Sequence, residues 1–298
     1  MQFHSGGEQF GSLFRQNNSL LKLKDITAKR YQDALNDLKE KGYADNTLDG
    51  VHRTGRMIFK KAIEMRIIKK DPTEFAYLKK HRKTIEELEE QEIPKCMEKE
   101  ELALLLQTSA QKGLDLDYLI FLTLSYTGMR VGELVSLKWK DIDFEEHTIS
   151  ITKTYYNPNN NTIEYQLVPP KTRRSKRSIV VDEDVIVALK ERLSDVYHDE
   201  GFIFAKKDRQ PGYPIFIKTV ENRMARLLKL AGLNTELTPH SLRHTHTSLL
   251  AEARVGLEEI MDRLGHCDDE TTKNVYLHVT KEMKKEASHK FGQLMRSL

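Results

Sequence analysis

The sequence has little cysteine, and it lacks both a long apolar run and the pattern of a secretory signal in its first residues. Its 298 residues include two cysteines, Cys96 and Cys267, which lie far apart in the chain and exclude a disulfide framework as the organising device. No apolar run approaches the roughly 18 residues that a membrane-spanning helix requires. The first residues, MQFHSGGEQF, have neither the basic nor the apolar segment of a signal peptide. These absences predict a protein of the reducing cytoplasm that makes no membrane contact.

The sequence also has little net charge, but its charges are unevenly distributed. The 48 lysines and arginines against 45 acidic residues leave +3, which by itself is weak evidence for a nucleic-acid partner. Residues 15–82 nevertheless hold 17 basic and 9 acidic residues, whereas residues 83–101 hold 3 and 8. A second basic cluster, KTRRSKR, spans residues 171–177. Each run alone is consistent with a solvated surface, but two separate runs favour a polyanionic partner, because phosphate neutralisation dominates nucleic-acid affinity.

The length predicts about two domains, and the acidic stretch marks the boundary between them. The N-terminal part has the apolar spacing of two helices, one from Thr27 to Glu40 and one from Thr47 to the Asp71-Pro72 step. We expect a helical domain over 1–84, a linker over 85–97 and a second domain over 98–298. The side chains expected in the helical core are Tyr31, Leu35, Leu38, Leu48, Val51, Met57, Ile58 and Ala62.

The second domain combines helical patterns with a few short strand patterns. Helices are expected over 98–111 and 116–126, and helical spacing resumes from Arg130 to Trp139 after a break at Gly128. Strand-like runs at 148–154, 163–168 and 177–181 follow, with a turn at 156–161 and a mostly helical pattern from 184 onward. The expected fold class is therefore mainly α with a small antiparallel β-sheet (α+β).

The segment LTPHSLRHTHTSLL, residues 237–250, carries the sharpest chemical signal. Thr238 suits a helix N-cap and Pro239 the first helical position. His240 and Arg243, three residues apart, then share a face in the first turn, where free amide groups carry partial positive charge. This arrangement predicts a phosphate site with a proton-transfer group beside it, and the alternative is an ordinary polar helix start.

Two other segments carry candidate site residues. Arg130 follows the break at Gly128 and has Glu133 three residues later, which indicates either a surface ion pair or a second arginine oriented by its glutamate. His266 follows Gly265, and Tyr276 lies ten residues further on. A tyrosine at helical spacing is by itself more often a packing residue than a nucleophile.

In this order the motifs TGMRVGEL, HSLRH and LGH, with a tyrosine about ten residues after the last, resemble the tyrosine recombinase (phage integrase) family. The family also places a lysine in a β-hairpin between the two arginines, and PPKTRRSKRSIVV occupies that place here. The resemblance implies a helical core-binding domain followed by a catalytic domain. It also implies a catalytic set with Glu133 in support: Arg130, Lys171, His240, Arg243, His266 and Tyr276.

The resemblance implies a reaction that needs neither metal, cofactor nor ATP. Tyr276 would attack a scissile DNA phosphate, giving a 3′-phosphotyrosine and a free 5′-hydroxyl, so that covalent catalysis conserves the phosphodiester energy. His240 would act as the base, and the two arginines would clamp the non-bridging oxygens. Lys171 would protonate the leaving 5′-oxygen, and His266 would donate a hydrogen bond to a non-bridging oxygen.

The implied function is integration and excision of a phage or mobile element by site-specific recombination. The expected partner is double-stranded DNA at attachment core sites, bound by a homo-tetramer with a directionality factor as a further candidate partner. The amphipathic segment 281–298, with Met283, Ala287, Phe291 and Leu294, is expected to contact a neighbouring protomer. The expected location is the cytoplasm of a bacterium, close to the nucleoid.

Several alternatives remain open at this level. His240, His244, His246 and His278 suggest a metal site, but the segment lacks the glutamate of a His-Glu-x-x-His zinc motif, which disfavours one. Only about twenty residues precede the family-like segment LKLKDIT, residues 21–27, so we expect no arm-binding domain and a missing or replaced first core-binding helix. The alternatives to an active recombinase are a truncated remnant that only binds DNA and a relaxing enzyme like the type IB topoisomerases.

Overall fold

The chain divides into two compact units, Met1–Gln91 and Glu92–Leu298. The computed structural model describes residues 15–16, 19–20, 22–78, 95–158, 161, 164–170, 172–193, 200–207, 210–265 and 270–296. The expected linker over 85–97 therefore lies mostly outside the described residues, and the domain boundaries drawn from the sequence stay a prediction.

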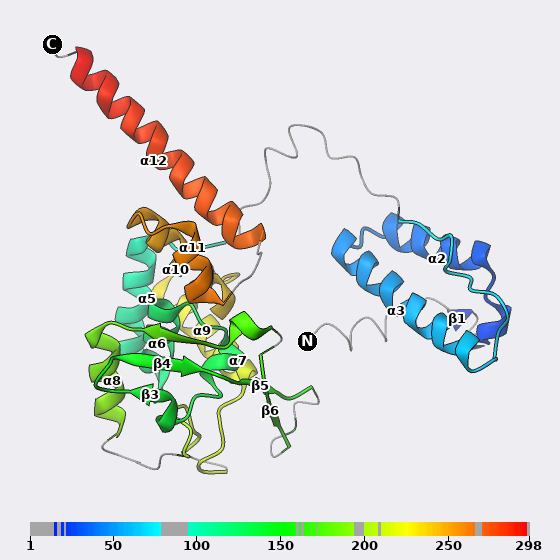
Figure 1. Ribbon diagram of the computed structural model, residues 1–298, viewed down its shortest axis with the longest axis horizontal. Helices are drawn as coiled ribbons and strands as arrows, with labels where there is room; N and C mark the ends of the chain where they lie inside the picture. Colours follow the sequence, from blue (N-terminus) through cyan, green and yellow to red (C-terminus); the bar gives the residue numbers. More distant parts are fainter. Residues whose placement is uncertain are drawn as a thin grey trace. The chain divides into compact units, whose positions relative to one another are not determined.

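Two amphipathic helices, α2 (Ala28–Glu40) and α3 (Asp45–Glu64), form the body of the N-terminal unit (Figure 1). A 3-10 turn, Leu23–Asp25, precedes them, as do the paired strands β1 (Arg15–Gln16) and β2 (Ser19–Leu20). Thr27 caps α2, because its hydroxyl oxygen accepts the Arg30 amide at 3.3 Å. The core between the helices includes Tyr31, whose ring lies edge-on to Phe59 at 5.8 Å. The first expected helix is thus confirmed.

The second expected helix is only partly right. α3 begins at Asp45 and ends at Glu64, several residues before the proline that was expected to stop it, because Arg66 adopts a left-handed φ of 57°. Its buried face follows positions three or four residues apart, which places Phe59 fully inside and leaves Met57 58% exposed. The expectation that Met57 belongs to the core is therefore wrong.

The C-terminal unit is built around α6 (Asp117–Thr127), which contacts the four helices α5, α7, α8 and α10 (Figure 1). Almost every α6 side chain is buried, which agrees with its nearly continuous apolar sequence. The other helices of the unit are α5 (Lys99–Lys112), α7 (Val131–Leu134), α8 (Glu183–Leu193), α9 (Ile217–Ala231), α10 (Pro239–Glu252), α11 (Leu257–Leu264) and α12 (Glu270–Arg296). The α5 and α6 expectations are confirmed, with bounds shifted by one residue.

The described residues of the C-terminal unit also form two small antiparallel sheets. In the first, β4 (Thr148–Ile151) pairs on one side with β3 (Ile142–Asp143) and on the other with β7 (Arg177–Val180). The second joins β5 (Thr154–Tyr156) to β6 (Gln166–Val168). A 3-10 turn, Arg173–Ser175, leads into β7. The α+β class expected from the sequence is confirmed.

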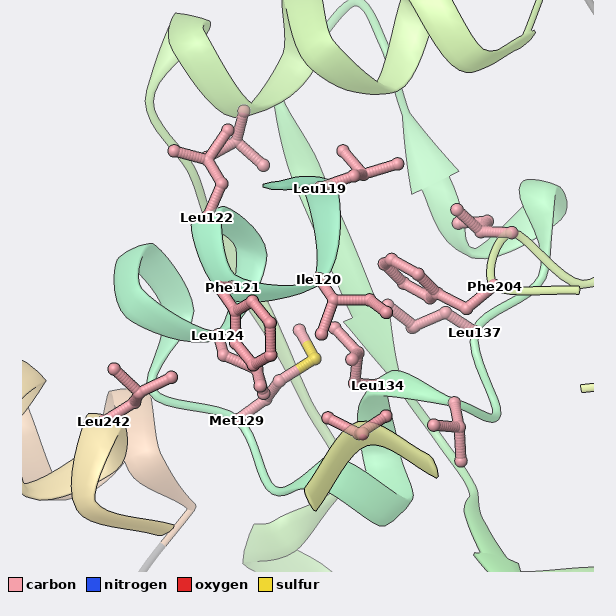
Figure 2. Close-up of a cluster of buried hydrophobic side chains, with 14 of the residues drawn as sticks. Leu119, Ile120, Phe121, Leu122, Leu124, Met129, Leu134, Leu137, Phe204 and Leu242 are labelled. Carbon is pink, nitrogen blue, oxygen red and sulfur yellow. The ribbon is translucent and has the colours of Figure 1, made fainter. Parts of the chain in front are cut away.

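The hydrophobic core fixes the turn that follows α6. Figure 2 shows side chains of α6 packed with Met129 and Leu134, which lie just before and within the short helix α7, and with Leu242 of α10. Met129 and Leu134 are 1% and 0% exposed. Each such side chain stabilises the fold by about 1.5–3 kcal/mol. Arg130, which lies between these two anchors, is thereby held at the start of α7.

Two details of the expected C-terminal unit are wrong. The helix expected from Arg130 to Trp139 ends at Leu134, because the Ser136 hydroxyl donates to the Glu133 carbonyl at 2.7 Å and Lys138 pairs with the distant Phe202. The run 148–154 divides between β4 and β5, which belong to different sheets. The expectation of a mostly helical chain after 184 is confirmed, and the described residues 200–207 and 210–216, which lie between α8 and α9, are held by long-range backbone bonds such as Ile203 N–H to Leu137 O at 3.1 Å.

The final helix, α12, begins at Glu270, well before residue 281, where the expected C-terminal helix begins. Its first two turns are partly buried, with Val275 at 1% exposure, and α12 contacts α10 and α11. Further along, Phe291 and Met295 are 63% and 52% exposed. In the described part of the chain, no helix combines the length and the apolar character needed to cross a bilayer.

Replacement of Gly128 by alanine is expected to destabilise the C-terminal unit. Gly128 has φ of 60°, and a Cβ built there would lie 2.6 Å from Cδ2 of the buried His246 and 2.8 Å from a Leu264 methyl. Backbone strain and overpacking, each of order 1–3 kcal/mol, would act together. Gly42→Ala is the matched control, because Gly42 has φ of 79° and open space around its Cα. Thermal unfolding should show the larger loss for Gly128→Ala, and equal losses would contradict the packing argument.

Candidate active site

Arg243 lies at the centre of the candidate site and is almost fully buried. It sits one turn into α10, whose first turn is capped as expected, with the Thr238 amide donating to the Ser241 hydroxyl at 3.1 Å. Arg243 is 2% exposed, and its guanidinium donates to Gly128 O at 2.5 Å and to Leu264 O at 2.6 Å. These carbonyls lie two residues before Arg130 and two residues before the position of His266. Arg243 therefore joins three segments that are distant in the sequence.

Arg130 is held by Glu133, but the glutamate has a second arginine partner. Arg130 donates from Nη1 to Glu133 Oε1 at 3.1 Å and from its backbone amide to Oε2 at 3.0 Å. Arg177 of β7 donates from Nη2 to Oε2, also at 3.0 Å. Glu133 is only 3% exposed, whereas the Arg130 side chain is 40% exposed. The expected Arg130–Glu133 pair is therefore present, with the carboxylate inside and the arginine reaching toward solvent.

A buried histidine and a fourth arginine, His246 and Arg263, bind backbone carbonyls at the end of α6. His246 Nδ1 donates to Ser125 O at 2.8 Å, and its Nε2 accepts from Arg263 Nε at 3.1 Å. Arg263 also donates to Val180 O and Tyr126 O, each at 2.9 Å. Burial first, and then the positive charge of Arg263, lower the pKa of His246 to about 3. His246 is thus a neutral structural group, and both of its ring nitrogens have protein partners.

His240, in contrast, lies at the exposed start of α10. It occupies the second helical position, three residues before Arg243, as expected from the sequence. Its ring lies at right angles to the ring of His244, with 4.7 Å between centroids. Around these histidines and elsewhere in the described residues, no group of three His, Cys, Asp or Glu side chains is placed to hold a metal ion. His240 thus presents an imidazole next to a helix N-terminus, where backbone N–H groups favour an anion.

Lys171 and His266 lie outside the described residues, but their neighbours contact each other. Thr172 Oγ1 and Ser175 Oγ are 2.8 Å apart, and Ser175 Oγ donates to Gly265 O at 3.3 Å. Gly265 has φ of 70° and packs against Arg177, so that an added Cβ would lie 2.9 Å from Arg177 Nη1. The segments next to Lys171 and His266 therefore meet at one place, beside Arg177, which binds Glu133.

Tyr276 lies in the second turn of α12 and is half-buried. Its ring packs against a small apolar cluster formed by Ala251, Ile260 and Leu264 from α10 and α11. Leu264 is also the residue whose carbonyl accepts from Arg243. The structure thus brings the helix of Tyr276 against α10, which carries His240 and Arg243, and against the end of α11.

Sequence reasoning missed three members of this cluster. Arg177 was counted only within a basic run, His246 was considered only as a metal ligand, and Arg263 was not singled out. Arg177 and its partner Glu133 lie 44 residues apart in the sequence, and His246 and its partner Ser125 lie 121 residues apart. No local spacing rule connects such positions, since helical spacing relates only residues three or four apart. The basic run at 171–177 was the one signal that pointed to Arg177.

Comparison with known proteins identifies relatives of the segment that carries the candidate site. Residues 95–283, which contain all the expected site residues, match the Phage integrase family. The chain is 36% identical to the integrase of Staphylococcus phage L54a, over 57% of this chain and 49% of that protein. It is 30% identical to a prophage ps2 probable integrase of Lactococcus lactis, over 89% of this chain and 70% of that protein. The chain thus spans about half the length of the phage L54a protein.

Solved structures show the same fold. The integrase of transposon Tn1549, in complex with transposon right end DNA, superposes with a TM-score of 0.69 at 23% identity, covering 96% of this chain and 94% of that one. A lambda integrase dimer bound to a COC′ core site superposes with a TM-score of 0.62 at 18% identity, covering 92% and 70%. With the family match over most of the second unit, these findings show that the chain belongs to the phage integrase family of tyrosine recombinases.

Proposed function

We propose that this protein is a site-specific recombinase that cuts and rejoins DNA through a 3′-phosphotyrosine, and so integrates and excises a phage or mobile element. The observation that carries the proposal is the position of Arg243. One buried guanidinium holds the turn before Arg130 and the end of the helix before His266, and it lies three residues from the exposed His240. A cluster of fixed positive charge beside a helix N-terminus and a base suits a phosphodiester.

Each expected residue has a role in the proposed reaction. The Tyr276 hydroxyl forms the new bond to phosphorus and passes its proton to His240, while the bond to the 5′-oxygen breaks. Arg130 and Arg243 offset the negative charge that grows on the non-bridging oxygens. Lys171 supplies a proton to the departing 5′-oxygen, and His266 donates to a non-bridging oxygen. Rejoining is the same displacement in reverse, with a 5′-hydroxyl as the attacking group.

The proposed substrate is double-stranded DNA at attachment core sites. The N-terminal helical unit, with its surplus of basic residues, serves as a core-binding domain over about 1–84, joined by a linker over 85–97 to the catalytic domain over 98–298. The exposed Phe291 and Met295 of α12 support a subunit contact in a homo-tetramer on paired sites. A directionality factor would bias integration against excision. Because the substrate is bacterial and phage DNA, we place the protein in the cytoplasm.

A nicked duplex that carries the attachment core tests the proposal directly. Because the short fragment released by the nick diffuses away, religation fails and the covalent intermediate accumulates. The wild-type protein should give a protein–DNA band that survives denaturation and EDTA, and protease digestion should leave a peptide on the 3′ end. Specific binding without any covalent band would overturn the recombinase proposal and favour a protein that only binds DNA.

A further inference from the structure

We propose that Arg177 is a positioning residue that sets the Arg130 guanidinium through their shared partner, the Glu133 carboxylate. The inference rests on the proposed function, because it concerns how the Arg130 guanidinium is oriented toward a scissile phosphate. It adds a residue that lies in a different element, β7, from both Arg130 and Glu133.

The carboxylate of Glu133 is shared between the two arginines atom by atom. Oε1 accepts from Arg130 Nη1 at 3.1 Å and from Arg177 Nη1 at 3.4 Å. Oε2 accepts from the Arg130 amide and from Arg177 Nη2, each at 3.0 Å. Because Arg177 meets both oxygens from one side, the carboxylate plane cannot rotate without breaking two of its bonds. The direction in which Oε1 meets Arg130 is thereby fixed.

Arg177 is itself held rigidly, which a positioning residue requires. Its side chain is 6% exposed. Its Nε donates to Arg263 O at 2.7 Å and its Nη1 donates to Ser175 O at 3.0 Å. Arg263 belongs to α11, which leads toward His266, and Ser175 belongs to the turn that follows Lys171. Arg177 therefore connects Glu133 by hydrogen bonds to the segments that lie next to His266 and Lys171.

Arg177 contributes most of the stabilisation of the ionised, buried Glu133 carboxylate. Burial alone would raise the pKa of Glu133, but hydrogen bonding to Arg177 and its charge, followed by the smaller contribution of Arg130, hold that pKa below its usual range. Arg177 thus keeps Glu133 ionised while Arg130 remains 40% exposed. A carboxylate that depended on Arg130 alone would draw that guanidinium inward, away from a substrate.

Lysine is not an adequate replacement at position 177. The arginine fork serves Glu133, Arg263 O and Ser175 O from three nitrogens in one plane, whereas an ammonium group donates from a single point. Arg177→Lys keeps the charge but loses the geometry, and a small displacement of a substrate-clamping group is enough to slow a reaction by about 100-fold. We expect this loss in the rate of strand cleavage, with little change in DNA affinity.

The test is a double-mutant cycle in the full-length protein on the nicked duplex. Single-turnover cleavage at saturating protein is measured for the wild type, Arg177→Lys, Arg130→Ala and the double variant, well below every variant's melting temperature. If Arg177 acts through Arg130, the double variant is no slower than Arg130→Ala alone. A purely structural role would slow cleavage by the same factor in both backgrounds and would overturn the proposal, as would a wild-type rate for Arg177→Lys.

The controls separate the possible failures. Arg226→Lys, at an exposed arginine of α9 that donates to Lys112 O at 3.1 Å, should cleave at the wild-type rate. If Arg177→Lys does not fold by circular dichroism, Arg177→Gln, which keeps a planar N–H donor, replaces it in the same cycle. A wild-type protein that forms no covalent complex refutes the proposed function, whereas an active wild type with multiplicative losses refutes only the role of Arg177.

Discussion

Tyr276→Phe is expected to abolish formation of the covalent protein–DNA complex while leaving the fold and DNA binding intact. The variant lacks the oxygen that would form the bond to phosphorus, and no neighbouring group replaces a missing nucleophile. The phenyl ring still fills the space between Ala251, Ile260 and Leu264, so the start of α12 should keep its packing. The measurement compares the denaturation-resistant band of wild type and variant on the nicked duplex at equal occupancy of the DNA.

The matched control for this prediction is Tyr118→Phe. Tyr118 lies on α6 and is 41% exposed, and the same hydroxyl is removed there without affecting the expected nucleophile. This variant should form the covalent complex at the wild-type rate. A covalent band that persists in Tyr276→Phe would show that another tyrosine is the nucleophile, and peptide mapping of the adduct would identify it.

Arg243→Lys is expected to reduce the cleavage rate by about 100- to 1000-fold, the effect typical of removing one donor from a preorganised anion site. It should also lower the free energy of unfolding by about 1–3 kcal/mol, because one ammonium group cannot serve both Gly128 O and Leu264 O, and a buried carbonyl loses its partner. Cleavage at saturating protein and urea unfolding, measured on the same preparation, give the two effects separately.

Arg254→Lys provides the control, because Arg254 is exposed and lies just after the same helix, α10. Neither cleavage nor stability should change there. If Arg243→Lys lost stability and still cleaved at the wild-type rate, Arg243 would only stabilise the fold. The scissile phosphate would then have to be bound by Arg130 and other groups.

Local features of the fold were predictable where one physical rule dominated. The nearly continuous apolar run of α6 predicts a buried helix, and the Thr238-Pro239 step predicts the start of α10; both are observed. The predictions were wrong where a distant partner competed with local preference. The helix after Arg130 stops at Leu134, because the following residues pair with the segment around Phe202 and Ile203. Met57 likewise lies outside, since the packing of α3 against α2 decides which face is buried.

The order of the motifs along the chain was enough to predict which residue types make up the candidate site, since His240 and Arg243 share a helix start and Arg130 and Glu133 are neighbours in a turn. Which of these groups are buried, and which partners orient them, depends on contacts between segments that are far apart in the sequence. Arg243 meets Gly128 across 115 residues, and Arg177 meets the Arg263 carbonyl across 86. Helical spacing relates only residues three or four apart, so such bonds leave no local pattern. They form because buried carbonyls and a buried carboxylate require donors, and the packing of α6, α10 and β7 places arginines within reach of them.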